Sequence, residues 1–231
     1  MNSNPPITSG PVPRWAVWGA LVLGCELGCA GMPWQCQKEH TSIITPAMRI
    51  SAIREGGSRA TGAGLEDHAQ LADELALQIR TERDPLVRKA IQETAGELEA
   101  PLAREMLIAG LSDDDLNVRL VCCQMLGKRG EPENVAPLQK ILEKTGDLDL
   151  RLAAADALGQ IRSPESIRAL GVALKDRDPA LQFAAVEAMK NLTDQDLGYD
   201  VKAWQQFAEQ GQLNVQPEVS LAQKVKQISP F

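Results

Sequence analysis

A short motif recurs along this chain at intervals of 31 or 32 residues. It begins with an aspartate and carries an apolar residue three positions later, and its copies start at Asp84, Asp115, Asp147 and Asp178. A fixed interval of this size is typical of solenoids, in which similar units stack on one another. The aspartate suits the start of a helix, because its carboxylate can accept hydrogen bonds from the free amides of the first turn. The sequence therefore predicts a stack of helical repeats.

Each motif is followed by an apolar helix face. Counting from the apolar residue, the positions three, four, seven and eight residues later are mostly small or aliphatic. They are Ala90, Ile91, Thr94 and Ala95; Val121, Cys122, Met125 and Leu126; Ala153, Ala154, Ala157 and Leu158; and Ala184, Ala185, Ala188 and Met189. This spacing places them on one side of a helix, which predicts a buried face that neighbouring helices can approach closely.

A second helix is expected before each motif-bearing helix, opened by Pro132-Glu133 in one copy and by Pro164-Glu165 in the next. Gly127 and Gly159 are expected to end the motif-bearing helices, because glycine adopts the left-handed conformation at low cost. Glu55 to Gly64 is expected to be a glycine-rich loop. A single helix hairpin cannot bury its own apolar face, so neighbouring hairpins must stack.

Composition agrees with close-packed helices, since the chain is 44% hydrophobic and only 3% aromatic. Asp147 to Gly159 nearly matches the pattern D-x-x-V-R-x-x-A-x-x-A-L-G, and it resembles the HEAT family in the short form associated with phycobilisome lyases. The resemblance covers about residues 66–192. It implies an all-α fold, an α-solenoid that winds as a right-handed superhelix of about four helix hairpins with capping helices. We expect this solenoid at residues 45–211 and a flexible tail at 212–231.

The first residues are typical of an export signal. Arg14 precedes an apolar run from Trp15 to Leu23, which is too short to cross a bilayer as a helix. Val22-Leu23-Gly24-Cys25 resembles the bacterial lipobox, so we expect residues 1–24 to be a signal peptide and Cys25 to be lipidated. Residues 25–44 would then be a flexible tether, and the protein a lipoprotein at the cell envelope, facing the periplasm or the exterior. The alternative is a cytoplasmic chain.

No metal, cofactor or catalytic residue is expected. Cys25, Cys29, Cys36 and His40 are ligand types that zinc uses, but their spacing is not that of a zinc knuckle. Cys29 and Cys36 can instead pair as a disulfide in an oxidising compartment. His68 is expected on the surface of a first helical turn. The pair Cys122-Cys123 is interpreted as core, because Cys122 fills an apolar repeat position, with redox or covalent chemistry as the alternative.

Candidate partner-binding residues are those that project from the repeats, together with one aromatic residue near the end. They are Arg88, Arg119, Arg151, Gln182 and Trp204. The structural alternatives are aspartate-to-arginine ladders between repeats and, for Trp204, a cap that seals the last repeat. The spacing of Asp200 and Trp204 also resembles the close of a group of bacterial HEAT-repeat lipoproteins.

The function predicted is a non-catalytic scaffold that presents its concave face to another protein and is attached to the membrane through its lipid. Nucleic acid is a poor partner, because 31 acidic residues against 24 basic ones give a formal net charge of −7. The alternative is a HEAT-repeat lyase-type enzyme, or an enzyme accessory, that acts on a tetrapyrrole or a protein. That alternative requires a ligand cleft with convergent polar groups.

Overall fold

A computed structural model describes residues 44–62, 64–193 and 195–210. The expected signal peptide, the lipidation site Cys25 and nearly all of the tether lie outside these residues, as does the tail at 212–231. Among the described helices, none combines the length and the apolar character that crossing a bilayer requires.

The described residues form ten α-helices and one short 3-10 turn. They are α1 (Pro46–Thr61), α2 (Leu65–Ile79), α3 (Pro85–Gly96), α4 (Pro101–Gly110), α5 (Leu116–Arg129), η2 (Pro132–Asn134), α6 (Val135–Lys144), α7 (Leu148–Gln160), α8 (Pro164–Ala173), α9 (Pro179–Thr193) and α10 (Val201–Gln210). Each motif-bearing helix is preceded by a partner helix, and α1 and α10 flank the four pairs. The all-α prediction is confirmed.

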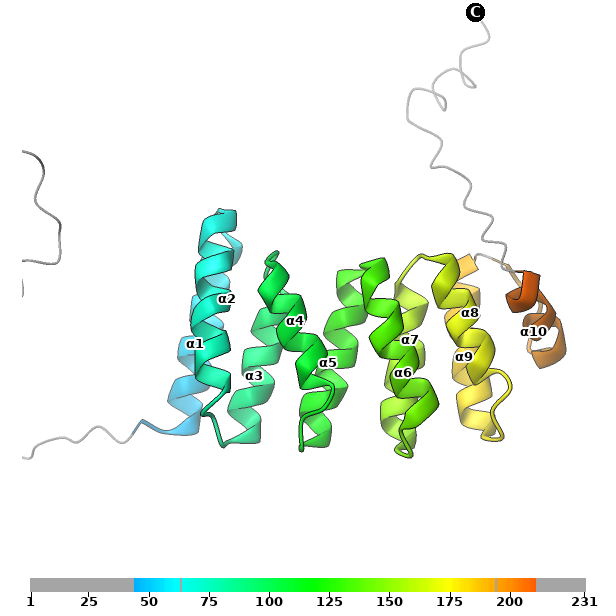
Figure 1. Cartoon of the computed structure of the whole chain (residues 1–231), viewed down its shortest axis with the longest axis horizontal. Coiled ribbons are helices and arrows are strands. Elements are labelled where there is room, and N and C mark those ends of the chain that lie inside the picture. Colours follow the sequence, from blue (N-terminus) through cyan, green and yellow to red (C-terminus); the bar gives the residue numbers. More distant parts are fainter. Residues whose placement is uncertain (1–43, 63, 194, 211–231) are drawn as a thin grey trace, which may run out of the picture. The chain divides into compact units, whose positions relative to one another are not determined.

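The helices stack in two layers (Figure 1). In the odd-numbered layer, α1 packs on α3, α3 on α5, α5 on α7 and α7 on α9. In the even-numbered layer, α2 packs on α4, α6 on α8 and α8 on α10. This arrangement confirms the α-solenoid, while its right-handed winding stays a prediction.

The motif aspartates cap the helices as expected. The carboxylate of Asp84 accepts from the amide of Leu86 at 2.9 Å, and that of Asp178 accepts from the amide of Ala180 at 2.8 Å. Asp115 and Asp147 cap α5 and α7 in the same way. The recurring aspartate therefore marks helix starts because it satisfies amides that have no partner within the helix.

Gly127 and Gly159 do not end their helices, so that prediction is wrong. Helix α5 continues to Arg129 and is followed by Gly130, which has a φ of 65°. The left-handed conformation that was expected at Gly127 therefore occurs at Gly130. A Cβ atom on Gly127 would lie 2.7 Å from the Cα of Ala157 in the next repeat. A Cβ on Gly159 would lie 2.8 Å from the Cβ of Ala188. These glycines are needed for close helix packing rather than for chain reversal.

The glycine-rich segment is helical from Glu55 to Thr61, so most of the loop expected from Glu55 to Gly64 is absent. It belongs to α1, where Gly57 faces α3, and a Cβ at this position would meet the Cγ2 of Thr94 at 2.8 Å. Thr94 holds the repeat position that Ala157 and Ala188 hold further along the chain. Helix α1 therefore follows the same packing rule as the repeats, although it lacks their motif.

Candidate protein-binding surface

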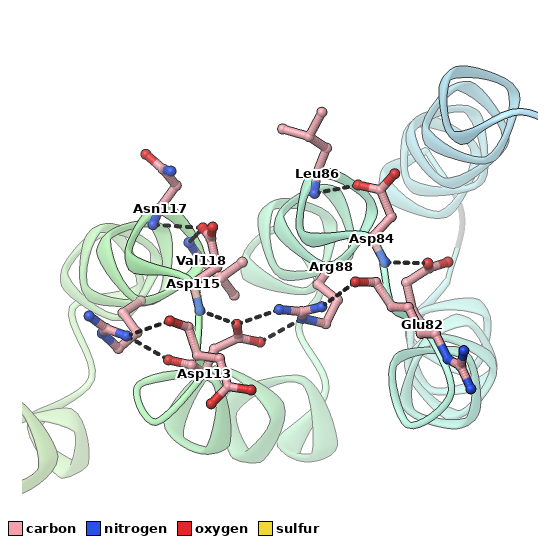
Figure 2. A network of polar contacts seen from close by, with 11 residues as sticks. Glu82, Asp84, Leu86, Arg88, Asp113, Asp115, Asn117 and Val118 are labelled. Carbon is pink, nitrogen blue, oxygen red and sulfur yellow. Dashed lines mark hydrogen bonds and ion pairs between the residues drawn. The ribbon is translucent and has the colours of Figure 1, made fainter.

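Arg88 links its own repeat to the next one (Figure 2). Its Nε and Nη2 atoms each donate to a carboxylate oxygen of Asp113 at 2.8 Å, and its Nη1 donates to the carbonyl oxygen of Arg83 at 2.9 Å. Asp113 also accepts from the amide of Asp115 at 2.9 Å. The hydrogen bonds from Arg88 hold the pKa of the Asp113 carboxyl below its ordinary value.

The same link recurs with one interruption. Arg151 pairs with Asp176 and also donates to the carbonyl oxygen of Leu142 at 3.0 Å. Arg119 has no aspartate at the equivalent place, because Thr145 stands there. Its Nη1 donates to the carbonyl oxygen of Asp113 at 2.7 Å, and its Nη2 lies 4.0 Å from a carboxylate oxygen of Asp147, the residue that caps α7 in the next repeat.

Gln182 completes the series by donating to the carbonyl oxygen of Asp176 at 2.7 Å. Arg88, Arg119, Arg151 and Gln182 therefore all bond to residues of their own chain, as the ladder alternative expected. Their hydrogen-bonding groups hold the turns between helices in place. We do not assign them to a partner-binding surface.

Trp204 is not available to a partner either. Its side chain is 0% exposed, and its indole Nε1 donates to the carbonyl oxygen of Gly198 at 3.0 Å. The ring meets Phe207 edge-on, with centroids 5.7 Å apart. Trp204 thus seals the last repeat from water, which is the capping role rather than the docking role.

Among the residues that the structure describes, the exposed aromatic side chains lie on α9 and in the loop that follows it. Phe183 is 55% exposed and Tyr199 is 61% exposed, and their rings stack with centroids 5.4 Å apart and an interplanar angle of 11°. The Nζ of Lys190 lies 4.7 Å from the Tyr199 ring centroid and 3.6 Å from a carboxylate oxygen of Glu187. We call Phe183, Glu187, Lys190 and Tyr199 the aromatic patch.

Phe183 of the patch lies five residues after the motif aspartate of its helix, and each preceding motif-bearing helix has a residue at the same repeat position. Lys89, Leu120 and Leu152 hold the place of Phe183 in the three preceding repeats, and each is half-buried. Sequence reasoning missed Phe183, although it directly follows the candidate Gln182. The available signal was an aromatic ring in the last motif-bearing helix, at a position that holds lysine or leucine in the earlier repeats, in a chain that is only 3% aromatic.

The adjacent cysteines are core residues, as interpreted from the sequence. Cys122 and Cys123 are both buried and neither forms a disulfide. Burial raises the pKa of both thiols, that of Cys123 to about 12. A thiol must ionise to act as a nucleophile, so this site opposes thiol chemistry.

His68 is buried, and the prediction of a surface residue is wrong. Its side chain lies 7% exposed between α1, α2 and the loop before α4. The Nδ1 atom accepts from the amide of Glu99 at 2.9 Å, so the proton sits on Nε2, which donates to the carbonyl oxygen of Ala60 at 2.9 Å. Because α1 extends to Thr61, its last carbonyls need donors, and His68 supplies one.

The described residues hold no group of three or more His, Cys, Asp or Glu side chains placed to bind a metal. One groove of about 420 Å³ between α1 and α3 is lined in part by Arg54, Glu93 and Thr94. Arg54 and Glu93 pair with each other at 3.2 Å. This groove has no nucleophile paired with a base, so it gives the lyase alternative no support.

The described residues form an α-solenoid in which the arginines of the repeats and Gln182 bond to residues of the same chain. The exposed rings of Phe183 and Tyr199 lie on the last motif-bearing helix and in the loop after it. A model of HEAT repeats matches residues 72–149 and 135–203, which together are more than half of the chain, so the protein belongs to the HEAT-repeat family. HEAT repeats commonly mediate protein–protein interactions, and proteins built from them are generally non-catalytic scaffolds.

Among solved structures, the chain is similar to an engineered protein whose crystal structure was determined by the Northeast Structural Genomics Consortium. The two are 18% identical, with a TM-score of 0.46 over 74% of this chain and 92% of the engineered one. No curated protein matches the chain.

Proposed function

We propose that this protein is a non-catalytic scaffold that binds another protein through the aromatic patch and is held at the bacterial cell envelope by a lipid on Cys25. The exposed, stacked pair of Phe183 and Tyr199 is the observation that carries the binding part of this proposal. Aromatic residues are enriched in the centres of protein interfaces, where burying one ring contributes a large share of the affinity.

The patch is also ordered before a partner arrives. Stacking on Tyr199 restrains the Phe183 ring, and the Nζ of Lys190 lies over the Tyr199 ring and restrains it further. Ordering a loose side chain on binding costs about 0.5–1.5 kcal/mol, and a ring that is already held avoids part of that cost. The geometry therefore favours recognition by a preformed surface.

The binding part is tested by the size of the native complex. Membranes from cells that express the wild type, Phe183→Ser or Leu77→Ser are extracted in mild detergent and separated on a native gel. Leu77 is a matched control, because it is 67% exposed on α2, in the other layer. We expect a complex larger than a single processed chain for the wild type and for Leu77→Ser, and its loss for Phe183→Ser. A complex that survives Phe183→Ser would refute binding through the patch.

The anchoring part rests on the lipobox-like run Val22-Leu23-Gly24-Cys25. Intact mass and membrane fractionation of the native protein are compared with those of Cys25→Ala. We expect a mass that matches a diacylglyceryl-modified chain from Cys25 to Phe231, and its loss together with membrane association in the variant. A chain that begins at Met1 and stays in the soluble fraction would contradict the envelope location.

A further inference from the structure

Each motif-bearing helix keeps one side accessible. The positions two, five, nine and thirteen residues after the motif aspartate are exposed or half-buried in all four helices, whereas the positions three, seven and eleven residues after it are buried in all four. Intervals of three and four residues place the accessible positions on a single side of each helix. We call this side the accessible face.

The accessible faces of neighbouring helices join into one surface. Helices α3, α5, α7 and α9 lie side by side in the odd-numbered layer (Figure 1). Glu97 and Lys128 both lie thirteen residues after the aspartates of their motifs, and they form an ion pair between consecutive repeats. Equivalent positions of neighbouring helices are therefore adjacent in space.

A row of large apolar side chains crosses this surface. Leu120, Leu152 and Phe183 lie five residues after the aspartates that open α5, α7 and α9. Leu120 and Leu152 are half-buried against the core, and Phe183 is 55% exposed. Because the axes of packed helices are about 8–10 Å apart, neighbouring members of the row are separated by about that distance.

This spacing fits an α-helix better than a β-strand. Seven residues of an α-helix advance by about 10.5 Å and bring side chains back to nearly the same side. Alternate residues of a strand, which point the same way, are only about 7 Å apart. The row therefore matches a helix that lies across α5, α7 and α9 and has an apolar side chain at every seventh residue.

Carboxylates flank the row. Asp149 and Asp156 lie three residues before and four residues after Leu152, and Glu187 lies four residues after Phe183. Both aspartates are exposed, and neither takes part in an ion pair among the described residues. Lysine or arginine beside the apolar ridge of a partner helix would supply counterions for these carboxylates, and an acidic helix would be repelled.

We propose that the partner presents a cationic amphipathic helix to the accessible face. Its apolar ridge contacts Leu120, Leu152 and Phe183, and its basic residues lie beside Asp149 and Asp156. This inference rests on the proposed function, because it extends the binding surface from the aromatic patch across α7 and α5 and names the chemistry that the surface recognises.

Synthetic peptides test the proposal on the full chain with Cys25→Ala. The probe is a dye-labelled peptide of about twenty residues, with leucine at every seventh position and lysines three and four residues after each leucine. One control peptide has glutamates in place of the lysines, and another has a central proline that breaks the helix. Fluorescence anisotropy measures the affinity of each peptide for the wild type and for variants. Asp156→Lys reverses a charge beside the row, and its matched control is Asp73→Lys at an exposed position of α2.

We expect the lysine peptide to bind the wild type saturably, and more weakly as the salt concentration rises. Asp156→Lys and Leu152→Ser should each weaken this binding about tenfold, whereas Asp73→Lys and Leu77→Ser should leave it unchanged. Because Asp156 is exposed, Asp156→Lys still decides the question if Leu152→Ser does not fold.

The proposal is overturned if the lysine peptide does not bind, if either control peptide binds equally well, or if Asp156→Lys binds like the wild type. The native-gel test of Phe183→Ser separates this failure from failure of the proposed function. Loss of the native complex in that variant, together with a failed peptide test, would retain the aromatic patch as a binding surface and reject only the cationic helix.

Discussion

Replacing Gly127 by alanine should destabilise the solenoid, although alanine is the better helix former. A Cβ at this position would lie 2.7 Å from the Cα and 3.0 Å from the carbonyl oxygen of Ala157. Both are backbone atoms, so α5 and α7 would have to separate by about 0.7 Å to reach ordinary contact at 3.4 Å. Overpacking of this kind costs about 1–3 kcal/mol, against a gain of about 0.5–1 kcal/mol in helix propensity.

The expected net loss is about 1–2 kcal/mol in the free energy of unfolding, or roughly 2–8 °C in melting temperature for a chain of this size. The matched control is Gly56→Ala in α1, where a Cβ would meet only the Leu71 side chain, with Cδ1 at 3.6 Å and Cδ2 at 4.0 Å. That variant should be more stable than the wild type by about 0.5–1 kcal/mol.

Thermal and urea unfolding followed by circular dichroism at 222 nm measures both variants on the Cys25→Ala background. Opposite signs for Gly127→Ala and Gly56→Ala are the predicted result. A Gly127→Ala variant as stable as the wild type would refute the argument that glycine is there for helix contact.

Three further outcomes follow from the ladder and the core. Arg88→Lys should cost about 1 kcal/mol after solvent screening, because lysine cannot make the paired hydrogen bonds to Asp113, and urea unfolding measures it. Folding lowers the pKa values of the Asp113 and Asp176 carboxyl groups, so both groups stabilise the folded chain when they are ionised. This stabilisation of the fold is fully present above the pKa values of the unfolded chain, and it is lost as the pH falls through the lowered pKa values of the folded chain. The urea midpoint should therefore fall on acidification below about pH 5, and less steeply in a double Asp→Asn variant of these two residues. In a variant with the other three cysteines replaced by serine, Cys122 and Cys123 should react with a thiol reagent only in denaturant, and rapid labelling of the folded chain at neutral pH would contradict their burial.

The stack of helix pairs was predictable from the sequence because its signals are local. The motif aspartates cap helices, and the apolar positions that follow them are separated by helical intervals. Both properties depend on the helix that contains them and on no distant residue. The repeat interval then specifies which helices are neighbours.

The misassigned residues all depend on contacts between repeats. Gly127 looks like a helix end in isolation, but it is explained by Ala157, a residue of the next motif-bearing helix. His68 follows two acidic residues and looks exposed, yet it bonds to the carbonyl of Ala60 and the amide of Glu99. The spacing of apolar residues within one helix does not show which residues of other helices or loops will contact it.

The candidate surface was only partly predictable, because the residues that form it also depend on contacts between repeats. The sequence located the outward side of the motif-bearing helices but could not distinguish an arginine that pairs with the next repeat from one left free. The pairing of Arg88 depends on Asp113, 25 residues later in the chain, and the stack of Phe183 with Tyr199 depends on the path of the loop after α9.

Site-specific crosslinking tests the central claim most directly. A photoreactive phenylalanine analogue is placed at residue 183, which is 55% exposed, or at the control residue 77 on α2, which is 67% exposed, and cells are irradiated before the envelope is isolated. The account predicts a discrete adduct of one defined mass from position 183 and none from position 77. Adducts that are absent from position 183, or identical from both positions, would contradict a scaffold that binds its partner through the aromatic patch.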